Sequence, residues 1–368
     1  MEQLNLFLLL LGIAYIYPIG AIIKQILIAY KEKDRSLLTD LVICFFLFIG
    51  IVLCVFYIFI SMDVYGDPYM PVYFWVIYGA ILILWILIFI FTLLHKGFRL
   101  FKSIDTLQEE YKSKNSTSKI RIDTKRKTSH FIFYILLWVG FLIVRPFIYT
   151  DPNWNELQYA SEIWDYNVEG QFYWINLLQN PNLYGEGCFL HLFLMIIFII
   201  SSYYFTMFEL IRHSNMLYLP VMKLLFPMFR LKEFDGVASN FHFFLSMTIT
   251  TFFLPPLLTI CVAGVGLFGD LMASQFGMRW GVHHYKFNKK KTYLGTIAGT
   301  VSSFLISALF LGTLYGAISA FVFMLTDLFT EKPIRISDNL ATPLLLTLVF
   351  ILANIVGINY LFPDFLLP

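Results

Sequence analysis

A succession of apolar stretches, each about twenty residues long, constrains this chain more than any other feature of its sequence. Twenty residues of helix rise about 30 Å, which is the thickness of the hydrocarbon core of a bilayer. The stretches lack the alternation of apolar and polar residues that is typical of barrel strands. We therefore predict an all-α, polytopic transmembrane helix bundle of about ten spans, at residues 4–30, 41–61, 72–95, 130–149, 188–208, 237–254, 255–275, 293–311, 314–330 and 341–361.

The composition agrees with this fold class. Hydrophobic residues make up 59% of the chain, charged residues make up 14%, and the mean hydropathy is +0.73. These values lie outside the range of soluble proteins. We expect an integral, multi-pass protein of the plasma membrane or the endoplasmic reticulum. The oligomeric state stays open, a homo-oligomer is compatible with the sequence, and no nucleic-acid partner is expected.

Lysine and arginine predict the orientation of the spans. Residues 96–129 carry ten Lys or Arg, whereas residues 150–187 carry none and have six Asp or Glu. The first segment is therefore expected to be cytoplasmic and the second to lie on the other side. Alternation along the remaining loops predicts that both termini are non-cytoplasmic.

The same pattern predicts three parts along the chain. Residues 1–100 are interpreted as an accessory N-terminal membrane module of three helices. Residues 101–129 form a basic cytoplasmic linker, and residues 130–368 form the functional membrane domain.

One stretch predicted to face the cytoplasm combines small residues with charge. On a helix, small residues four apart form a stripe along which another backbone or a ligand can approach closely. Such residues occur at Gly269, Ala273, Gly277 and Gly281, and again at Gly295 and Gly299. Asp270 lies beside the first stripe, and Lys289, Lys290 and Lys291 precede the second, close to a predicted helix N-terminus. This arrangement suits a polyphosphate and its metal ion.

Carboxylates on the predicted cytoplasmic side strengthen this interpretation. Topology explains lysines there, but it does not require Asp270, Asp327 or Asp338. With Asn339 they offer hard oxygen ligands opposite a lysine cluster, the composition expected for Mg²⁺ and phosphates. Explanations that need no bound ligand stay open. The lysines can be the flank that the positive-inside rule requires, and Glu209 can simply pair with Arg212.

Several ordered motifs carry a resemblance over residues 125–361. They are Arg126-Lys127-x-x-His130, Glu209-x-x-Arg212, Arg230-x-x-Glu233, Gly269-Asp270-x-x-Ala273-x-x-x-Gly277 with Lys290-Lys291-Thr292-x-x-Gly295, and Asp338-Asn339-Leu340-x-x-Pro343. With them the chain resembles the CTP-dependent lipid-alcohol kinases, namely dolichol kinase, phytol kinase and fungal-type diacylglycerol kinase. It departs from that pattern at Leu294, Ser337 and Ala341.

The resemblance implies phosphorylation of a long-chain lipid alcohol, a polyprenol or dolichol first of all, with CTP as phosphoryl donor and Mg²⁺ as cofactor. Its expected catalytic residues are Asp270, Glu209, Lys127 and His130, and its expected metal ligands are Asp270, Asp327, Asp338 and Asn339. The expected nucleotide-binding residues are Arg126, Gly277, Arg279, Lys289, Lys290, Lys291, Thr292 and Gly295. Alternatives are another lipid kinase of this family, a phosphatidate cytidylyltransferase-like enzyme and, less favoured, a transporter.

Overall fold

The structure is a computed structural model that describes residues 2–33, 35–65, 70–98, 102–115, 119–148, 187–213, 217–330 and 336–358. These residues are helical apart from loops and one antiparallel bridge between His284 and Thr292. Within them, seven helices are long and apolar enough to cross a membrane. The chain is therefore an all-α, multi-pass integral membrane protein. The seven spans are Gln3–Lys31, Leu37–Ile60, Met70–Phe98, Phe193–Arg212, Pro256–Trp280, Tyr293–Leu311 and Asp338–Ile355.

Ten spans are not confirmed, because three expected spans are not among the seven. The helix α11 (Ser239–Phe253) has 15 residues and α15 (Thr313–Phe329) has 17. Both are shorter than the roughly 20 residues that cross a hydrocarbon core upright. The third expected span, 130–149, lies in α5 (Lys119–Ile148), where residue 149 and the side chains from residue 141 onwards lie outside the described part.

The chain divides into two compact units. Unit 1 comprises Met1–Arg126 and Ile196–Leu245, and unit 2 comprises Lys127–Met195 and Ser246–Pro368. The helices α5, α8 (Gly187–Arg212) and α11 contribute to both units.

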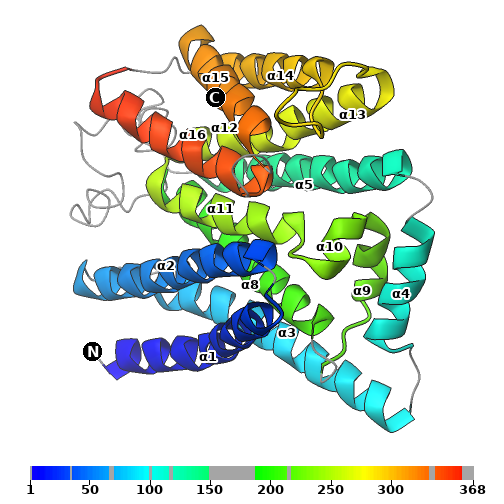
Figure 1. The fold of residues 1–368 in the computed structure, drawn as a ribbon. Helices are drawn as coiled ribbons and strands as arrows, with labels where there is room; N and C mark the ends of the chain where they lie inside the picture. Colours follow the sequence, from blue (N-terminus) through cyan, green and yellow to red (C-terminus); the bar gives the residue numbers. More distant parts are fainter. Residues whose placement is uncertain are drawn as a thin grey trace. The chain divides into compact units, whose positions relative to one another are not determined.

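Unit 1 contains α1 (Glu2–Lys31), α2 (Arg35–Tyr65) and α3 (Met70–Phe98), and Figure 1 shows α1 and α2 side by side. Aromatic rings join these helices to α8. Phe7 stacks on Phe74 with ring centroids 3.9 Å apart. The Tyr203 hydroxyl donates to the Ala14 carbonyl at 2.8 Å and accepts from the Trp85 indole at 2.9 Å. In the apolar interior of a membrane protein such internal partners replace water for each polar group.

Short helices complete unit 1. They are α4 (Ile104–Asn115), α9 (Met222–Leu225), the 3₁₀ turn Phe226–Met228 and α10 (Leu231–Asp235). The segment 101–129 thus contains α4 and the beginning of α5.

Unit 2 contains α12 (Pro256–Gly264), a π-helical turn (Val265–Gly269) and α13 (Asp270–Trp280), which follow one another without a break, and then α14 (Tyr293–Leu311), α15 and α16 (Asp338–Ile355). The helix α14 packs closely against both α13 and α15. The turn between α14 and α15 rests on Gly312, whose φ of 85° favours glycine. These contacts bring the cytoplasmic ends predicted for α13, α14 and α15 into one unit.

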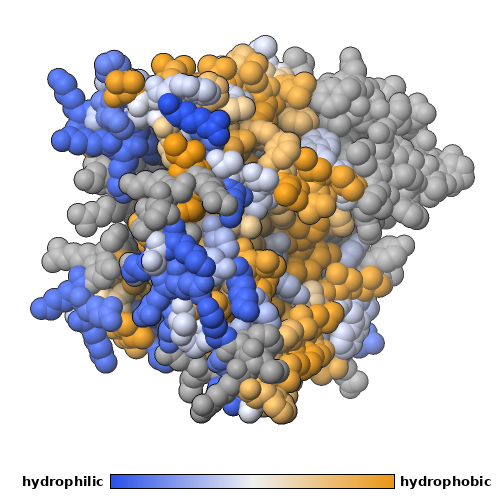
Figure 2. Space-filling view, turned by 90° about the vertical axis from the view of Figure 1, so that its right-hand side faces the viewer, coloured by the Kyte–Doolittle hydropathy of each residue, from blue (hydrophilic) through white to orange (hydrophobic). Residues whose placement is uncertain are grey.

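Large hydrophobic side chains remain exposed along the helices of both units. Leu9 and Ile16 of α1 expose 61% and 67% of their surface, and Ile297 and Leu305 of α14 expose 59% and 60%. Figure 2 shows that hydrophobic side chains form broad areas of the surface. Hydrophobic side chains exposed in this way are suited to contact with lipid chains.

Candidate functional site

The two stripes of small residues face each other within unit 2. A side chain at Gly295 would lie 2.6 Å from the Ala273 carbonyl oxygen and 3.1 Å from the Gly277 Cα atom. One at Gly299 would lie 2.8 Å from the Gly269 carbonyl oxygen. The predicted close approach is therefore confirmed, and the partner is another helix of the same chain. Because Gly277 and Gly295 have no side chains, the backbones of α13 and α14 can approach each other closely. This contact fixes the positions of the polar residues next to the glycines.

Asp270 is the first residue of α13 and directly follows the π-helical turn. Such turns are rare and frequently occur at functional sites. The Asp270 carboxylate forms an ion pair with the Lys127 ammonium group, and the two side chains expose 15% and 1% of their surface. Contacts further along α5 hold Lys127 in place, since the Tyr134 ring lies 5.3 Å from the Phe268 ring and Trp138 stacks on Phe310.

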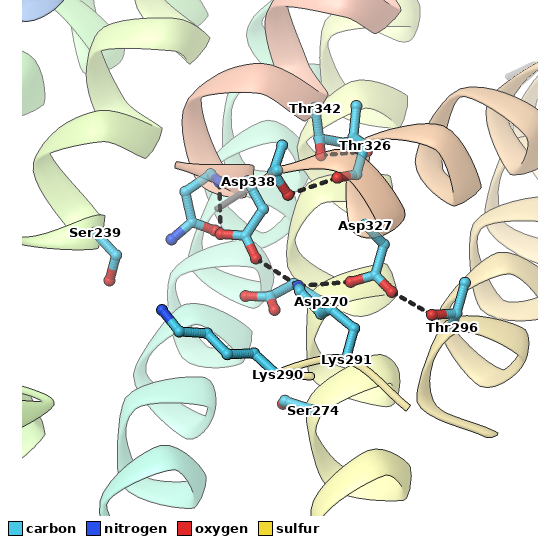
Figure 3. A network of polar contacts seen from close by, with 12 residues as sticks. Ser239, Asp270, Ser274, Lys290, Lys291, Thr296, Thr326, Asp327, Asp338 and Thr342 are labelled. Carbon is cyan, nitrogen blue, oxygen red and sulfur yellow. Dashed lines mark hydrogen bonds and ion pairs between the residues drawn. The ribbon is translucent and has the colours of Figure 1, made fainter. Parts of the chain in front are cut away.

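A second cluster is centred on Lys291, in the loop before α14. Its Nζ atom donates to Asp327 Oδ1 at 2.7 Å and to Asp338 Oδ2 at 3.0 Å. Asp327 Oδ2 accepts from the Thr296 hydroxyl at 2.6 Å. Figure 3 shows the side chains of Asp270, Asp327 and Asp338 pointing towards the same region around the Lys291 ammonium group.

The charge of Lys291 is maintained by this environment. Burial alone would lower the pKa of the ammonium group, but Asp338 and Asp327 raise it above its usual value. Lys291 is therefore positively charged throughout the physiological range of pH.

The loop before α14 is ordered by its own hydrogen bonds. Thr292 is the N-cap of α14, and its hydroxyl accepts from the Gly295 amide at 3.1 Å. The buried Asn288 side chain donates to the carbonyl oxygens of Leu328 and Thr330 at 3.1 and 3.3 Å. These contacts attach the loop to the end of α15 and so fix the backbone from which Lys291 extends.

The three predicted lysines differ in their surroundings. Lys291 lies in the cluster with Asp327 and Asp338, whereas Lys289 and Lys290 are exposed, as is Arg279 near the end of α13. Asn339 is buried, its backbone amide donates to Asp338 Oδ1 at 3.0 Å, and its backbone carbonyl accepts from the Ser246 hydroxyl at 3.1 Å.

Arg126 and Glu209 lie in unit 1, within a separate network of buried charges. Arg126 donates to Asp123 Oδ1 at 3.0 Å, to Glu233 Oε1 at 3.3 Å and to the Ser239 hydroxyl at 2.9 Å. Glu209 accepts from Arg212 at 2.5 Å and from the Ala238 amide at 3.2 Å. Both side chains are thus committed to protein partners.

Arg212 and Arg230 complete this network around α10. Arg212 donates to the carbonyl oxygens of Glu233, Phe234 and Gly236, which are the free acceptors at the end of the short helix. Arg230 is the N-cap residue of α10, and its side chain pairs with Asp123 at 2.6 Å. Among the described side chains, three arginines and three carboxylates take part in this network.

Burial disfavours the charged form of Glu233, but Arg126, Arg230 and hydrogen bonds from Ser239 and the Arg230 amide outweigh it and lower its pKa to about 2. This carboxylate therefore stays ionised and holds α10 in place.

The remaining predicted residue, His130, lies in α5, and its side chain falls outside the described residues. In the part of the chain that the structure describes, no group of three or more His, Cys, Asp or Glu side chains is arranged to hold a metal ion. Thr296 in the Lys291 cluster, and Asp123 and Ser239 in the buried network, were not predicted. Thr296 follows the glycine signature directly, and Asp123 precedes Arg126 by three residues, the spacing of an ion pair on one helix face.

Comparisons of the chain with models of protein families, with curated proteins and with solved structures find no match.

Proposed function

We propose that this protein is a lipid-alcohol kinase that transfers the γ-phosphoryl group of CTP to the hydroxyl group of a polyprenol or dolichol at the cytoplasmic membrane face. The observation that carries the proposal is that unit 2 contains two groups of paired charges, Lys127 with Asp270 and Lys291 with Asp327 and Asp338, and that Asp270 points towards the region around Lys291 (Figure 3). These side chains come from four helices and one loop, and all belong to the elements that unit 2 packs together.

Phosphoryl transfer depends on positioning and on cations around the phosphate oxygens. Lys291 and Lys127 supply ammonium groups, and the N-terminus of α14 adds backbone amides suited to an anion. Lys289, Lys290 and Arg279 can extend the positive charge towards the nucleotide.

Asp327, Asp338 and Asn339 would hold Mg²⁺. Two carboxylates fit this ion, because Mg²⁺ in proteins usually keeps several waters and phosphate oxygens and takes only one or two carboxylates. Mg²⁺ supplies neutralisation of the charge that develops on the transferred phosphoryl group.

In the reaction, the lipid hydroxyl oxygen forms a bond to the γ-phosphorus while the bond from that phosphorus to the β–γ bridging oxygen breaks, so CDP leaves. The hydroxyl proton passes to a carboxylate. We assign this role to Asp270, since it lies in unit 2 with the lysine cluster. The contacts of Glu209 and Arg126 favour positioning roles for these two residues.

The test is transfer of label from γ-³²P-CTP, compared with γ-³²P-ATP, to a panel of polyprenol, dolichol, phytol, geranylgeraniol and diacylglycerol. The purified full chain is assayed with Mg²⁺. Label in one lipid alcohol with a preference for CTP is expected, and Asp270→Asn is expected to reduce the rate by about 100-fold or more.

Glu110→Gln is the matched control, because Glu110 pairs with the exposed Lys102 and Lys114 of unit 1. It is expected to keep the wild-type rate. Absence of label in every lipid, with folded protein, would refute the kinase, and incorporation of α-labelled CTP with phosphatidate would point to a cytidylyltransferase.

A further inference from the structure

The Lys291 ammonium group lies where the proposed function would put a metal ion. It is 2.7 Å from Asp327 Oδ1 and 3.0 Å from Asp338 Oδ2, and so it bridges two carboxylates from different helices. A divalent cation shared by Asp327 and Asp338 would occupy this same position. The ammonium group is therefore a stand-in cation supplied by the protein itself.

Both carboxylates are held by groups other than Lys291. Asp327 Oδ2 accepts from the Thr296 hydroxyl at 2.6 Å, and Asp338 Oδ1 accepts from the Asn339 backbone amide at 3.0 Å. These bonds would keep the carboxylates oriented if the ammonium group moved.

Lys291 itself has a fixed backbone and a flexible side chain. Its amide donates to the Asn288 carbonyl at 3.1 Å, and its carbonyl accepts from the Tyr285 amide at 3.3 Å. Its charge stands on a four-carbon stem with several rotatable bonds. The ammonium group can thus move without any change in the loop.

We propose that Lys291 is an internal counter-ion that closes the cation position between Asp327 and Asp338, and that a divalent cation enters only when an anionic phosphate group draws the ammonium group away. The identity of that phosphate, a nucleoside triphosphate, rests on the proposed function. The closed cation position rests on the geometry alone.

Charge balance makes the two binding events depend on each other. If the ammonium group left without a replacement, two largely buried carboxylates would repel each other with no cation between them, which is strongly unfavourable. If a cation entered alone, the displaced ammonium group would have no anion to meet. Cation and phosphate together satisfy both requirements, so each raises the affinity of the other by the same factor, about 5- to 150-fold for typical couplings.

The test uses Mn²⁺ as a probe, with free Mn²⁺ measured by electron paramagnetic resonance in solutions of the purified full chain without nucleotide or lipid alcohol. Lys291→Met is expected to bind one Mn²⁺ at least about tenfold more tightly than the wild type. Adding Asp327→Asn to this variant is expected to abolish the gain. Equal Asp327-dependent affinity in wild type and Lys291→Met would overturn the proposal.

Lys286→Met is the matched control, because it removes the same charge from the same loop at an exposed position to which no role in binding is assigned. Its Mn²⁺ affinity is expected to equal that of the wild type. A gain as large as that of Lys291→Met would show a general charge effect and would also overturn the proposal.

The wild-type protein decides the question if Lys291→Met does not fold. Mn²⁺ binding that depends on Asp327 is expected only when inorganic tripolyphosphate is present. Such binding at micromolar Mn²⁺ without any phosphate would contradict the closed position.

These measurements contain neither CTP nor lipid, so they are independent of the kinase assay. Label transfer combined with tight wild-type Mn²⁺ binding at Asp327 would refute only the role of Lys291. The expected Mn²⁺ results without label transfer would refute only the kinase.

Discussion

Glu233 illustrates how much of unit 1 depends on single buried charges. It binds Arg126, Ser239 and the Arg230 amide while only 3% of its surface is exposed. Removing one partner of a buried ion pair leaves the other charge without full compensation. We expect Glu233→Gln to destabilise the protein by roughly 3 kcal/mol at neutral pH, measured as a lower midpoint of thermal unfolding in detergent.

The same residue predicts a pH dependence. Its pKa is lowered from 4.5 to about 2 in the folded protein. The ionised Glu233 carboxylate therefore contributes its full stabilisation of the folded state above the pKa that Glu233 has in the unfolded chain. This contribution is lost as the pH falls from about 4.5 towards 2. The difference between wild type and Glu233→Gln should narrow over this window.

Glu110→Gln is the control for both measurements, because its ion pairs with Lys102 and Lys114 are exposed and contribute little to stability. An equal effect of Glu110→Gln, or a difference for Glu233→Gln that does not change with pH, would contradict the role of burial.

For single residues, the sequence shows which side chains are candidates for the site better than it shows which other side chains they contact. Asp270, Lys291 and Asp327 could be singled out because topology does not require carboxylates beside a lysine cluster. Their pairing could not be predicted, since Lys127 and Asp270 are far apart in the chain and meet only through packing of α5. The exposed Lys289 and the ion-paired Lys291 look alike in a triple lysine, and only the fold separates them.

Among the helices, α13 and α14 depend on the absence of side chains between them. We expect Gly299→Val to prevent the close approach at Gly269 and to lower the midpoint of thermal unfolding strongly, because overpacking of a tight contact forces backbone shifts. The matched control is Gly79→Val in α3, since nothing lies within 4 Å of a side chain added there. Similar midpoints for both variants would argue against the contact.

A smaller loss of stability is expected from changing the N-cap of α14. The Thr292 hydroxyl caps the helix through the Gly295 amide. We expect Thr292→Val to cost about 1 kcal/mol, the usual value for a lost N-cap, and Thr292→Ser to retain most of the stability. Chemical unfolding of each variant, monitored by hydrogen exchange at the first turn of α14, measures the free energy of unfolding of both. A Ser variant as unstable as the Val variant would exclude capping as the cause.

Helix positions could be predicted where hydrophobicity decides them, as the match at 293–311 confirms. The C-terminal end of α13 could not be predicted in this way. Its glycines disfavour helix, yet contact with α14 extends it to Trp280, beyond the predicted boundary at 275. Two neighbouring prolines, Pro255 and Pro256, separate α11 from α12 at the boundary that the sequence predicts, but they leave α11 with only 15 residues.

For the whole molecule, the charge pattern predicts which ends face the cytoplasm. A single cysteine introduced by Lys102→Cys or Lys289→Cys is expected to react with a membrane-impermeant maleimide from the cytoplasmic side only. A single cysteine introduced by Gln3→Cys or Val356→Cys is expected to react from the opposite side only. Sealed vesicles of known orientation and a chain without its native cysteines provide the measurement. Labelling of Lys289 and Val356 positions from the same side would refute the predicted topology.

The π-helical turn before Asp270 constrains the length of the chain as well as its composition. One residue corresponds to about 100° of helix rotation, so a deletion within Val265–Gly269 would turn α13 relative to α12 even if every other residue stayed the same. Asp270 would then leave the face from which it meets Lys127. The segment should therefore keep its length more strictly than its composition, except at Gly269, where an added side chain would lie 2.6 Å from both Phe323 and Ser303.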